Sequence, residues 1–331
     1  MGRLIDGQWN NDEVAPKTKD GQYIRRDSIF RNWVTADGAP GPSGEGGFKA
    51  EPGRYHLYIA INCPWAHRTQ IVRALKGLED AVSMSTTLPR RNDQGWVFDN
   101  SGEKFREHLF GKTALHEIYT TADPDYSGRV TVPVLWDKTR GTVVNNESSE
   151  IIRMFNSAFD GAGAGNPSLD LYPADLRGEI DAINERVYNN VNNGVYRAGF
   201  ARTQDAYEDA YDAVFETLDA LEERLAGQRY LVGNRLTEAD WRLFPTLARF
   251  DVAYVGAFKC NKRRIIDYPN LWDYARELFQ MPGIAGTVVP EVYKRGYYSI
   301  SAERNPLGIV PKGPEVDFTA PHGRDRLPAA A

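Results

Sequence analysis

The sequence predicts a chain in two parts, a small α/β domain followed by an all-helical domain. In the first half, a β-prone run at 55–61 passes through a cysteine into a helical pattern. A second β-prone run at 130–137 is followed by a short turn, another strand and the start of a helix. Beyond the Gly-rich stretch 161–165, almost every segment has helical apolar periodicity. This order predicts a fold of the α/β plus all-α class.

Length and composition agree with two soluble globular domains. The chain has 331 residues, of which 41% are hydrophobic and 26% charged. A formal net charge of −5 gives no basic footprint for nucleic acid or an anionic membrane. We expect no transmembrane helix, because no run of about 18 apolar residues occurs, and the first residues lack the apolar run of a signal peptide. Two cysteines are too few for a disulfide scaffold, so we expect a reducing, cytoplasmic compartment.

The first 50 residues are predicted to form an extension that wraps over the surface. They are polar and rich in Gly, Pro and Asp, and the segment 38–47 has too much Gly and Pro for regular structure. The aromatic patch at 30–34 is expected to dock on the rest of the protein. We therefore place an N-terminal extension at 1–50, an α/β domain at 51–162, a helical domain at 163–312 and a C-terminal tail at 313–331.

Two strand-to-helix connections define the α/β domain. The strand at 55–61 leads through Cys63 and Pro64 into a helix whose apolar residues recur at helical spacing up to Leu78. The strand at 130–137 and a short strand at 142–144 form an antiparallel hairpin, and a helix starts near Ser148. The long segment between these two parts is predicted to be irregular.

In the second half, helices are predicted at 175–193, 203–226 and 237–256. The last of these begins with Thr237, and Asp240 follows three residues later. This spacing resembles a capping box with Asp in place of Glu, so we assign it to folding and not to chemistry.

Cys63 is the candidate reactive residue. It lies at the predicted N-cap of a helix, and Pro64 suits the first helical position because its missing N–H would be unpaired there in any case. The positive end of the helix favours a thiolate. Ala66 stands where a dithiol oxidoreductase has its second cysteine, so the site has one thiol and a mixed disulfide needs an outside thiol such as glutathione. The alternative is a buried structural cysteine, which is the interpretation that we favour for Cys260.

Two further features are typical of a thioredoxin-like domain. Pro133 lies within a predicted strand, where proline is normally excluded. A cis bond would explain it and would direct the backbone of Val132 at the cysteinyl part of glutathione; an edge-strand proline is the alternative. Glu147 and Ser148 open a helix, where the hydroxyl and the helix N-terminus can hold the γ-glutamyl carboxylate and Glu147 the ammonium. A plain N-cap is the alternative for Ser148.

These motifs, in this order, resemble the glutathione transferases. The run Asn-Cys-Pro-Trp-Ala-His-Arg at 62–68 is similar to that of the glutathionyl-hydroquinone reductases, the xi class of that superfamily. The resemblance covers nearly the whole chain. Its further supporting segments are 30–35, 193–201, 250–254, 258–261 and 321–323.

The resemblance implies the reaction. Cys63 thiolate attacks the sulfur of a glutathionyl-hydroquinone, the hydroquinone leaves, and a second glutathione resolves the mixed disulfide to give oxidised glutathione. Tyr196 matches the tyrosine that protonates the leaving ring, and Tyr254 and Tyr297 match tyrosines that stabilise the thiolate. The expected glutathione contacts are Trp96, Arg129, Val130, Thr131, Val132, Glu147 and Ser148. The resemblance also implies a homodimer and no metal. With 17 tyrosines in the chain, spacing alone assigns none of the three to the site.

Two other functions remain open on the residues alone. One is an omega-like glutathione-dependent thioltransferase or dehydroascorbate reductase, because Cys63 suits that chemistry as well. The other is a non-catalytic ligand-binding protein with a glutathione transferase fold, which needs no reactive thiol. A conjugating transferase is disfavoured, because a cysteine at this position would form a mixed disulfide with glutathione.

Overall fold

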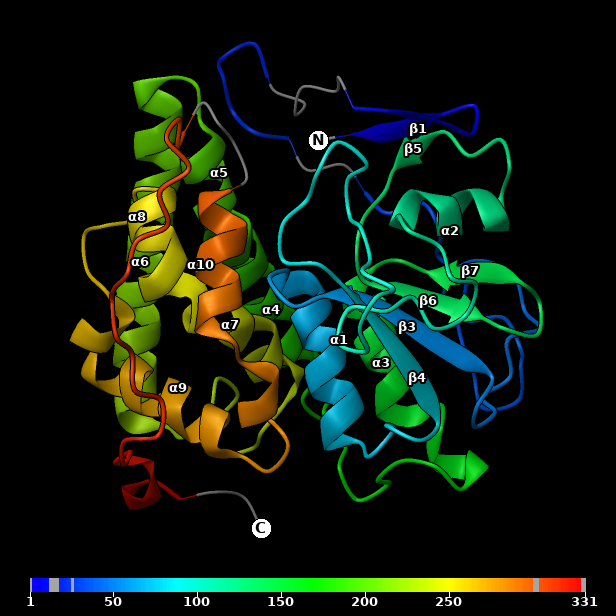
Figure 1. Ribbon diagram of the computed structural model, residues 1–331. Helices are drawn as coiled ribbons and strands as arrows, with labels where there is room; N and C mark the ends of the chain where they lie inside the picture. The colour runs from blue at the N-terminus through cyan, green and yellow to red at the C-terminus, as the bar shows by residue number, and fades with distance from the viewer. Residues whose placement is uncertain (1, 12–17, 25–26, 300–303, 329–331) are drawn as a thin grey trace. The chain divides into compact units, whose positions relative to one another are not determined.

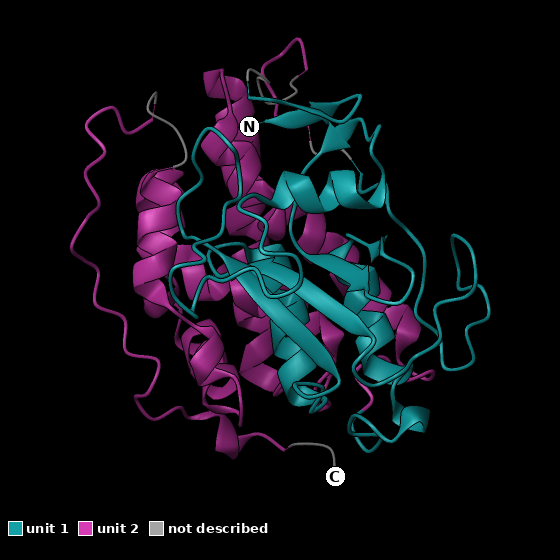
Figure 2. Cartoon of the chain, turned by 45° about the vertical axis from the view of Figure 1, so that its right-hand side comes forward, with its two compact units in different colours: residues 1–15, 26–169 teal, residues 16–25, 170–331 magenta. Residues whose placement is uncertain are grey.

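The computed structural model describes residues 2–11, 18–24, 27–299 and 304–328. The chain divides into two compact units, coloured separately in Figure 2. The first comprises Met1–Ala15 and Arg26–Leu169, and the second comprises Pro16–Arg25 and Asp170–Ala331. The fold class predicted from the sequence is confirmed, because the first unit is α/β and the described regular elements of the second are all helical.

A four-stranded mixed sheet forms the centre of the first unit (Figure 1). Its order is β4-β3-β6-β7; β3 is parallel to β4 and antiparallel to β6, and β6 is antiparallel to β7. Every residue of β3 is buried, as expected for a central strand covered on both faces. The strands are β3 (Tyr55–Ala60), β4 (Val82–Thr87), β6 (Val134–Asp137) and β7 (Thr142–Asn145).

A second, three-stranded sheet is made by the N-terminal residues. The hairpin of β1 (Arg3–Ile5) and β2 (Gln8–Asn10) adds to β5 (Gly128–Arg129), with Arg3 opposite Arg129. The sequence predicted no strands in this extension. The single long strand predicted at 130–137 was also wrong, because residues 130–133 lie in neither sheet and the ladder begins only at Val134. Pro133 has no N–H to donate to a ladder.

Three longer helices complete the first unit: α1 (Pro64–Leu75), α2 (Leu115–Ala122) and α3 (Ser148–Ser157). The first and third pack against each other (Figure 1), and a short 3₁₀ turn follows at Asp160–Ala162. The predicted helix starts after Cys63 and near Ser148 are confirmed. Strand β4 and helix α2 fall in the segment that was predicted to be irregular, which was wrong.

The second unit is helical, and the three long helical segments predicted from periodicity are confirmed within a few residues. Two π-helical turns, η2 and η3, interrupt them. The helices are α4 (Arg177–Val187), η2 (Tyr188–Asn192), α5 (Gly194–Phe200), α6 (Gln204–Gly227), α7 (Glu238–Arg249), η3 (Phe250–Tyr254), α8 (Val255–Ala257), η4 (Ile265–Asp267), α9 (Pro269–Gln280), η5 (Ala285–Thr287), α10 (Pro290–Tyr298) and η6 (Arg324–Arg326).

The start of α7 contains the predicted capping box. The Thr237 hydroxyl accepts a hydrogen bond from the Ala239 N–H, and Asp240 accepts from the Thr237 N–H at 2.8 Å. The fully buried Asp240 carboxylate also accepts from the Leu231 N–H and from the hydroxyl of Tyr274. This carboxylate therefore joins the start of α7, the preceding loop and α9.

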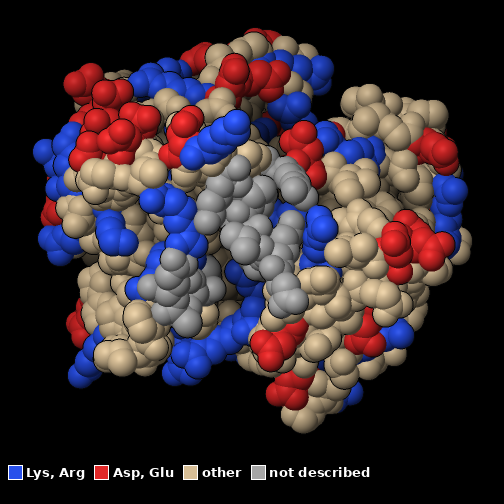
Figure 3. Space-filling model, turned by 90° about the horizontal axis from the view of Figure 1, so that it is seen from above, with Lys and Arg blue, Asp and Glu red and all other residues tan. Residues whose placement is uncertain are grey.

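Figure 3 shows basic and acidic side chains intermixed on one face of the molecule. Within the described residues, no helix is long and apolar enough to cross a membrane. The same part of the chain contains no group of three or more His, Cys, Asp or Glu side chains arranged to hold a metal ion.

Candidate active site

Cys63 occupies the position expected for a reactive thiol. It is the N-cap of α1 with an extended backbone, Pro64 takes the first helical position, and the cysteine is partly exposed and free. The His67 N–H donates to the Cys63 carbonyl at 3.0 Å, which closes the first turn of the helix. Ala66 is fully buried, so the position of a second thiol is occupied by a packed methyl group. The helix start therefore presents a single sulfur.

The sulfur of Cys63 lies beside the backbone that precedes Pro133. Its Sγ is 3.8 Å from the Val132 carbonyl oxygen, and the Val132–Pro133 peptide bond is cis, as expected from the sequence. The side chains of Val130 and Val132 are buried, and Thr131 is half-buried. The main chain of Val132, and not its buried side chain, therefore lies next to the thiol.

The positions of Glu147 and Ser148 at the start of α3 differ from the N-cap role that the sequence suggested for Ser148. Glu147, not Ser148, is the N-cap of α3, and its carboxylate accepts from the Ser149 N–H at 3.1 Å. The same carboxylate accepts from the hydroxyls of Ser28 at 3.2 Å and Ser148 at 3.4 Å. Ser148 is the first helical residue and is buried. The pair thus combines a negative charge with the N-terminus of a helix.

Trp96 lies on the loop between β4 and α2. The Trp96 carbonyl accepts from the Leu115 N–H at 2.8 Å, and the guanidinium of Arg91 lies over the indole ring, 4.9 Å from its centroid. Arg129 is in β5, where its carbonyl accepts from the Tyr126 hydroxyl at 3.1 Å. These two residues come from separate segments of the first unit.

In the second unit, the three candidate tyrosines come together although they are far apart in sequence. Tyr196 is in α5, Tyr254 ends η3 and Tyr297 is in α10. The Tyr297 hydroxyl is 2.6 Å from that of Tyr196 and 3.0 Å from that of Tyr254. Tyr254 and Tyr297 are buried, whereas Tyr196 is half-buried. The hydroxyls thus form a chain whose most exposed member is Tyr196.

The central tyrosine of this chain is held in its neutral form. Burial and the neighbouring hydroxyls of Tyr196 and Tyr254 raise the pKa of Tyr297, and the positive charge of Arg249 opposes this effect only in part. Arg249 is fully buried, donates to the Pro245 carbonyl at 2.8 Å and lies 3.8 Å from the centre of the Tyr293 ring. Tyr297 therefore keeps its proton at neutral pH and can act as a hydrogen-bond donor.

Phe258 packs the tyrosines together. The centre of its ring lies 5.3, 5.4 and 5.5 Å from the ring centres of Tyr196, Tyr254 and Tyr297. Gly199 lies against this ring, and a Cβ atom there would approach Phe258 Cγ to 2.2 Å. Only glycine fits at that point of α5 without moving Phe258.

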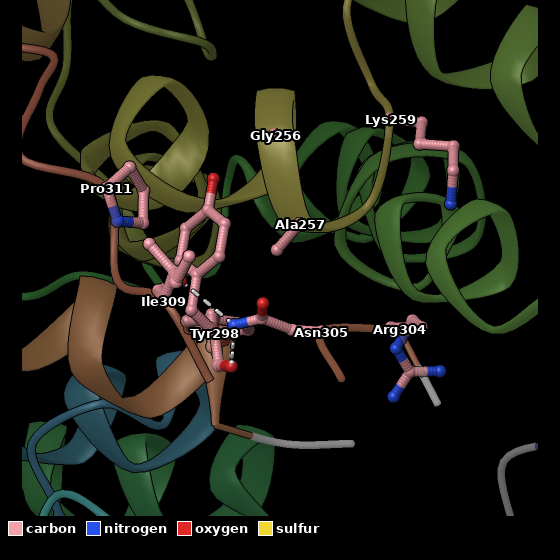
Figure 4. A pocket seen from close by; sticks show the side chains of 9 residues that line it. Gly256, Ala257, Lys259, Tyr298, Arg304, Asn305, Ile309 and Pro311 are labelled. Carbon is pink, nitrogen blue, oxygen red and sulfur yellow. Dashed lines mark hydrogen bonds between the residues drawn. The ribbon is translucent and has the colours of Figure 1, made fainter. Parts of the chain in front are cut away.

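A pocket of about 290 Å³ opens beside Tyr297 in the second unit (Figure 4). Basic side chains of Lys259 and Arg304 line it together with Tyr298 and Ile309. The amide of Asn305 donates to the Tyr298 carbonyl at 2.7 Å and to that of Ile309 at 3.0 Å, which fixes one wall. A cavity of about 150 Å³ already holds benzene, so this pocket has room for a one-ring compound.

Cys260 has the surroundings of a structural cysteine, as predicted. It is completely buried, and burial raises the pKa of its thiol to about 12. Its Sγ lies 3.9 Å from the Phe258 carbonyl oxygen. A thiol in this environment stays protonated and does not compete with Cys63 as a nucleophile.

Sequence reasoning missed several residues that support the candidate site. Tyr119, Asn146 and Ser28 contact the segments around Val132 and Glu147, and Arg249 lies beside the tyrosines. Nothing in the spacing of the sequence distinguishes these residues from ordinary core or surface positions. Phe258 lies in segment 258–261, which supports the family resemblance, but the sequence did not predict that its ring packs against the three tyrosines.

The similarity to known proteins covers nearly the whole chain. The N-terminal domain signature of glutathione S-transferases matches residues 62–158, and the C-terminal domain signature matches 204–277. The chain is 53% identical to glutathionyl-hydroquinone reductase YqjG of Escherichia coli K12 over 98% of its length and 99% of that protein. It is 51% identical to glutathionyl-hydroquinone reductase PcpF of Sphingobium chlorophenolicum, covering 95% of this chain and 96% of the relative.

Solved structures agree with this relationship. The glutathione-bound structure of YqjG superposes with a TM-score of 0.90, covering 98% of this chain and 99% of that one at 51% identity. A Xi-class glutathione transferase from Natrialba magadii also gives a TM-score of 0.90, at 44% identity, covering all of this chain and 98% of the other.

Proposed function

The chain belongs to the glutathione transferases, in the group that contains the Xi class and the glutathionyl-hydroquinone reductases, and from this membership we propose how it works. It removes glutathione from glutathionyl-hydroquinones and uses a second glutathione as the reductant. The observation that carries the proposal is the single, partly exposed thiol of Cys63 at the N-terminus of α1, with the methyl group of Ala66 in place of a resolving cysteine.

Cys63 is the proposed nucleophile. Its thiolate attacks the sulfur of the glutathionyl group, the bond between that sulfur and the aromatic carbon breaks, and the electron pair stays with the ring. Cys63 and glutathione are then joined as a mixed disulfide. A second glutathione thiolate attacks the glutathione sulfur of this disulfide, which releases oxidised glutathione and regenerates the Cys63 thiolate. No internal thiol can take that role, because Cys260 is buried and protonated.

Tyr196 is the proposed proton donor to the ring carbon. Tyr196 is half-buried and stands at one end of the chain of hydroxyls through Tyr297 to Tyr254, so a proton given up by Tyr196 is replaceable along the hydrogen bonds. The second glutathione supplies the net proton as its thiol ionises. Tyr254 and Tyr297 are proposed to stabilise the thiolate as hydroxyl donors, a role that favours a charged acceptor.

Glutathione is proposed to bind along the first unit. The main chain of Val132 pairs with the cysteinyl peptide, Ser148 and the start of α3 hold the γ-glutamyl carboxylate, and Glu147 holds the ammonium. Trp96 packs against the tripeptide, and Arg129, Val130 and Thr131 complete the binding segment. The charge of Glu147 next to the helix N-terminus supports this assignment.

Replacement of Cys63 by alanine tests the proposal. Cys63→Ala is expected to abolish release of hydroquinone from a glutathionyl-hydroquinone, whereas the matched control Cys260→Ala keeps it. Mass spectrometry after exposure of the unchanged protein to this substrate should find one glutathione adduct, on Cys63. Normal turnover by Cys63→Ala, or an adduct on Cys260, would contradict the mechanism.

The same thiol also suits an omega-like thioltransferase or dehydroascorbate reductase. Rates measured side by side on a glutathionyl-hydroquinone, a small mixed disulfide and dehydroascorbate distinguish the two activities. The pocket beside Tyr297, which has room for one ring, and the chain of tyrosine hydroxyls favour the aromatic substrate. A ligand carrier would bind glutathione and turn over none of the three compounds.

We also propose that the protein works in the cytoplasm as a homodimer. Two free cysteines suit a reducing compartment. Light scattering after gel filtration tests the dimer, since a mass of twice 37.2 kDa is expected.

A further inference from the structure

The hydroxyl of Tyr119 joins the two backbone segments that are proposed to hold glutathione. Tyr119 is fully buried in α2. Its hydroxyl donates to the Thr131 carbonyl at 2.9 Å, and accepts from the Thr131 N–H at 3.3 Å and from the amide Nδ2 of Asn146 at 3.1 Å. A tyrosine hydroxyl has one proton to donate and two lone pairs. The proton and both lone pairs of the Tyr119 hydroxyl are therefore used in hydrogen bonds to Thr131 and Asn146.

The two partners of Tyr119 directly precede the expected glutathione contacts. Thr131 comes immediately before Val132, whose carbonyl lies 3.8 Å from the sulfur of Cys63. Asn146 comes immediately before Glu147, the N-cap of α3. One oxygen atom thus sets the separation between the segment for the cysteinyl peptide and the segment for the γ-glutamyl group.

The N-terminal extension fixes the other side of this junction. The Phe30 N–H donates to Asn146 Oδ1 at 3.2 Å, and the Asn146 N–H donates to the Phe30 carbonyl at 3.2 Å. The Phe30 ring packs edge-on against Tyr119, with ring centres 5.8 Å apart, and stacks on Tyr126 at 5.4 Å. Asn146 is therefore held from both sides and transmits the position of Tyr119 to the start of α3.

We propose that Tyr119 is a positioning residue for glutathione, which holds the Val132 backbone and the Glu147–Ser148 helix start at the spacing of the bound tripeptide. Tyr119 hydrogen-bonds to Thr131 and Asn146 and acts on the two segments through them. The inference rests on the proposed function, since it requires glutathione to bind along these two segments. It also gives the N-terminal extension a role in binding, through Phe30.

The test compares the affinity of purified full-length variants for S-methylglutathione, which cannot form a disulfide with Cys63. Tyr119→Phe keeps the ring and removes only the hydroxyl. The matched control is Tyr55→Phe, because Tyr55 is also fully buried in the first unit and donates to one backbone carbonyl, that of Lys49, at 2.7 Å. Tyr55 begins β3, at the end of that strand remote from Cys63.

Titration calorimetry should give about 5- to 10-fold weaker binding for Tyr119→Phe, as expected for loss of one buried hydrogen-bonding group. Tyr55→Phe should bind within twofold of the unchanged protein, even if both variants lose similar thermal stability. Equal affinity of Tyr119→Phe and the unchanged protein, or equal weakening in both variants, would overturn the inference alone. Failure of the unchanged protein to bind would overturn the proposed function and this inference with it.

A second variant decides the question if Tyr119→Phe does not fold. Asn146→Ala removes the link from the hydroxyl to α3 and keeps Tyr119 and its bonds to Thr131. It should weaken binding in the same direction, by about threefold or more. Unchanged affinity in a folded Asn146→Ala protein would overturn the inference.

Discussion

Replacement of Gly199 by alanine should displace the ring that packs the three tyrosines together. A Cβ atom at this position would lie 2.2 Å from Phe258 Cγ and 2.3 Å from Cδ1, whereas ordinary contacts begin at 3.4 Å. Phe258 is buried, so its ring has to move by about 1.2 Å into neighbouring side chains, or α5 has to move away from it.

The expected size of the effect combines two opposing contributions. Alanine stabilises a helix by about 0.5–1 kcal/mol relative to glycine, whereas overpacking of a filled core costs about 1–3 kcal/mol. We expect Gly199→Ala to lower the free energy of unfolding by about 1–2 kcal/mol. Because a 1 Å displacement near reacting groups can cost on the order of 100-fold in rate, turnover of a glutathionyl-hydroquinone should fall by about 10- to 100-fold.

Gly178→Ala is the matched control. Gly178 also lies in a helix, α4, but a Cβ atom there meets nothing within 4 Å. This variant should gain up to about 1 kcal/mol of stability in urea unfolding and keep its turnover. If Gly199→Ala were as stable as Gly178→Ala and equally active, the proposed packing of Phe258 against the tyrosines would be refuted.

Three further predictions concern other parts of the chain. Burial raises the pKa of Asp240 from 3.8 to about 6, so its stabilising contribution is complete below pH 3.8 and is lost as the pH rises through 6. The stability difference between the unchanged protein and Asp240→Asn should therefore fall by about 2 kcal/mol from pH 4 to 7, and a flat or rising difference would contradict this. Arg324→Met removes three hydrogen bonds from a buried guanidinium to the carbonyls of residues 225, 228 and 229, and urea unfolding should find a loss of about 2–4 kcal/mol; unchanged stability would count against it. Tyr196→Phe should slow hydroquinone release by about 100-fold with unchanged affinity for S-methylglutathione, and equal turnover would exclude Tyr196 as the proton donor.

The sequence was sufficient to predict helix starts, because the residues that define a cap are at most three positions apart. Pro64 after Cys63 predicted the start of α1, and the spacing of Thr237 and Asp240 predicted the cap of α7; both are confirmed. The long helices of the second unit were found because amphipathic periodicity accumulates over many residues. Strand β4 was missed, because its run Val-Ser-Met-Ser-Thr-Thr is short and polar and forms only by pairing with β3.

The N-cap of α3 shows where prediction from neighbouring residues fails. The sequence favoured Ser148 as the N-cap, because serine is a preferred residue there, but Glu147 takes that position in the structure. In the folded protein the Glu147 carboxylate accepts from Ser28, which is 119 residues away in the sequence. Such long-range contacts depend on how the N-terminal extension docks, and no short pattern encodes them.

By itself, the sequence determined that this protein presents one candidate thiol at a helix start, because a strand, Cys63, Pro64 and Ala66 follow one another directly and local backbone chemistry fixes their roles. The family resemblance pointed to Tyr196, Tyr254 and Tyr297 among 17 tyrosines, but only the tertiary structure decided that their hydroxyls share hydrogen bonds. It also decided that the Tyr119 hydroxyl lies between Thr131 and Asn146. The physical reason is that a hydroxyl acts over about 3 Å, and residues 43 to 101 positions apart come within that distance only after their helices have packed.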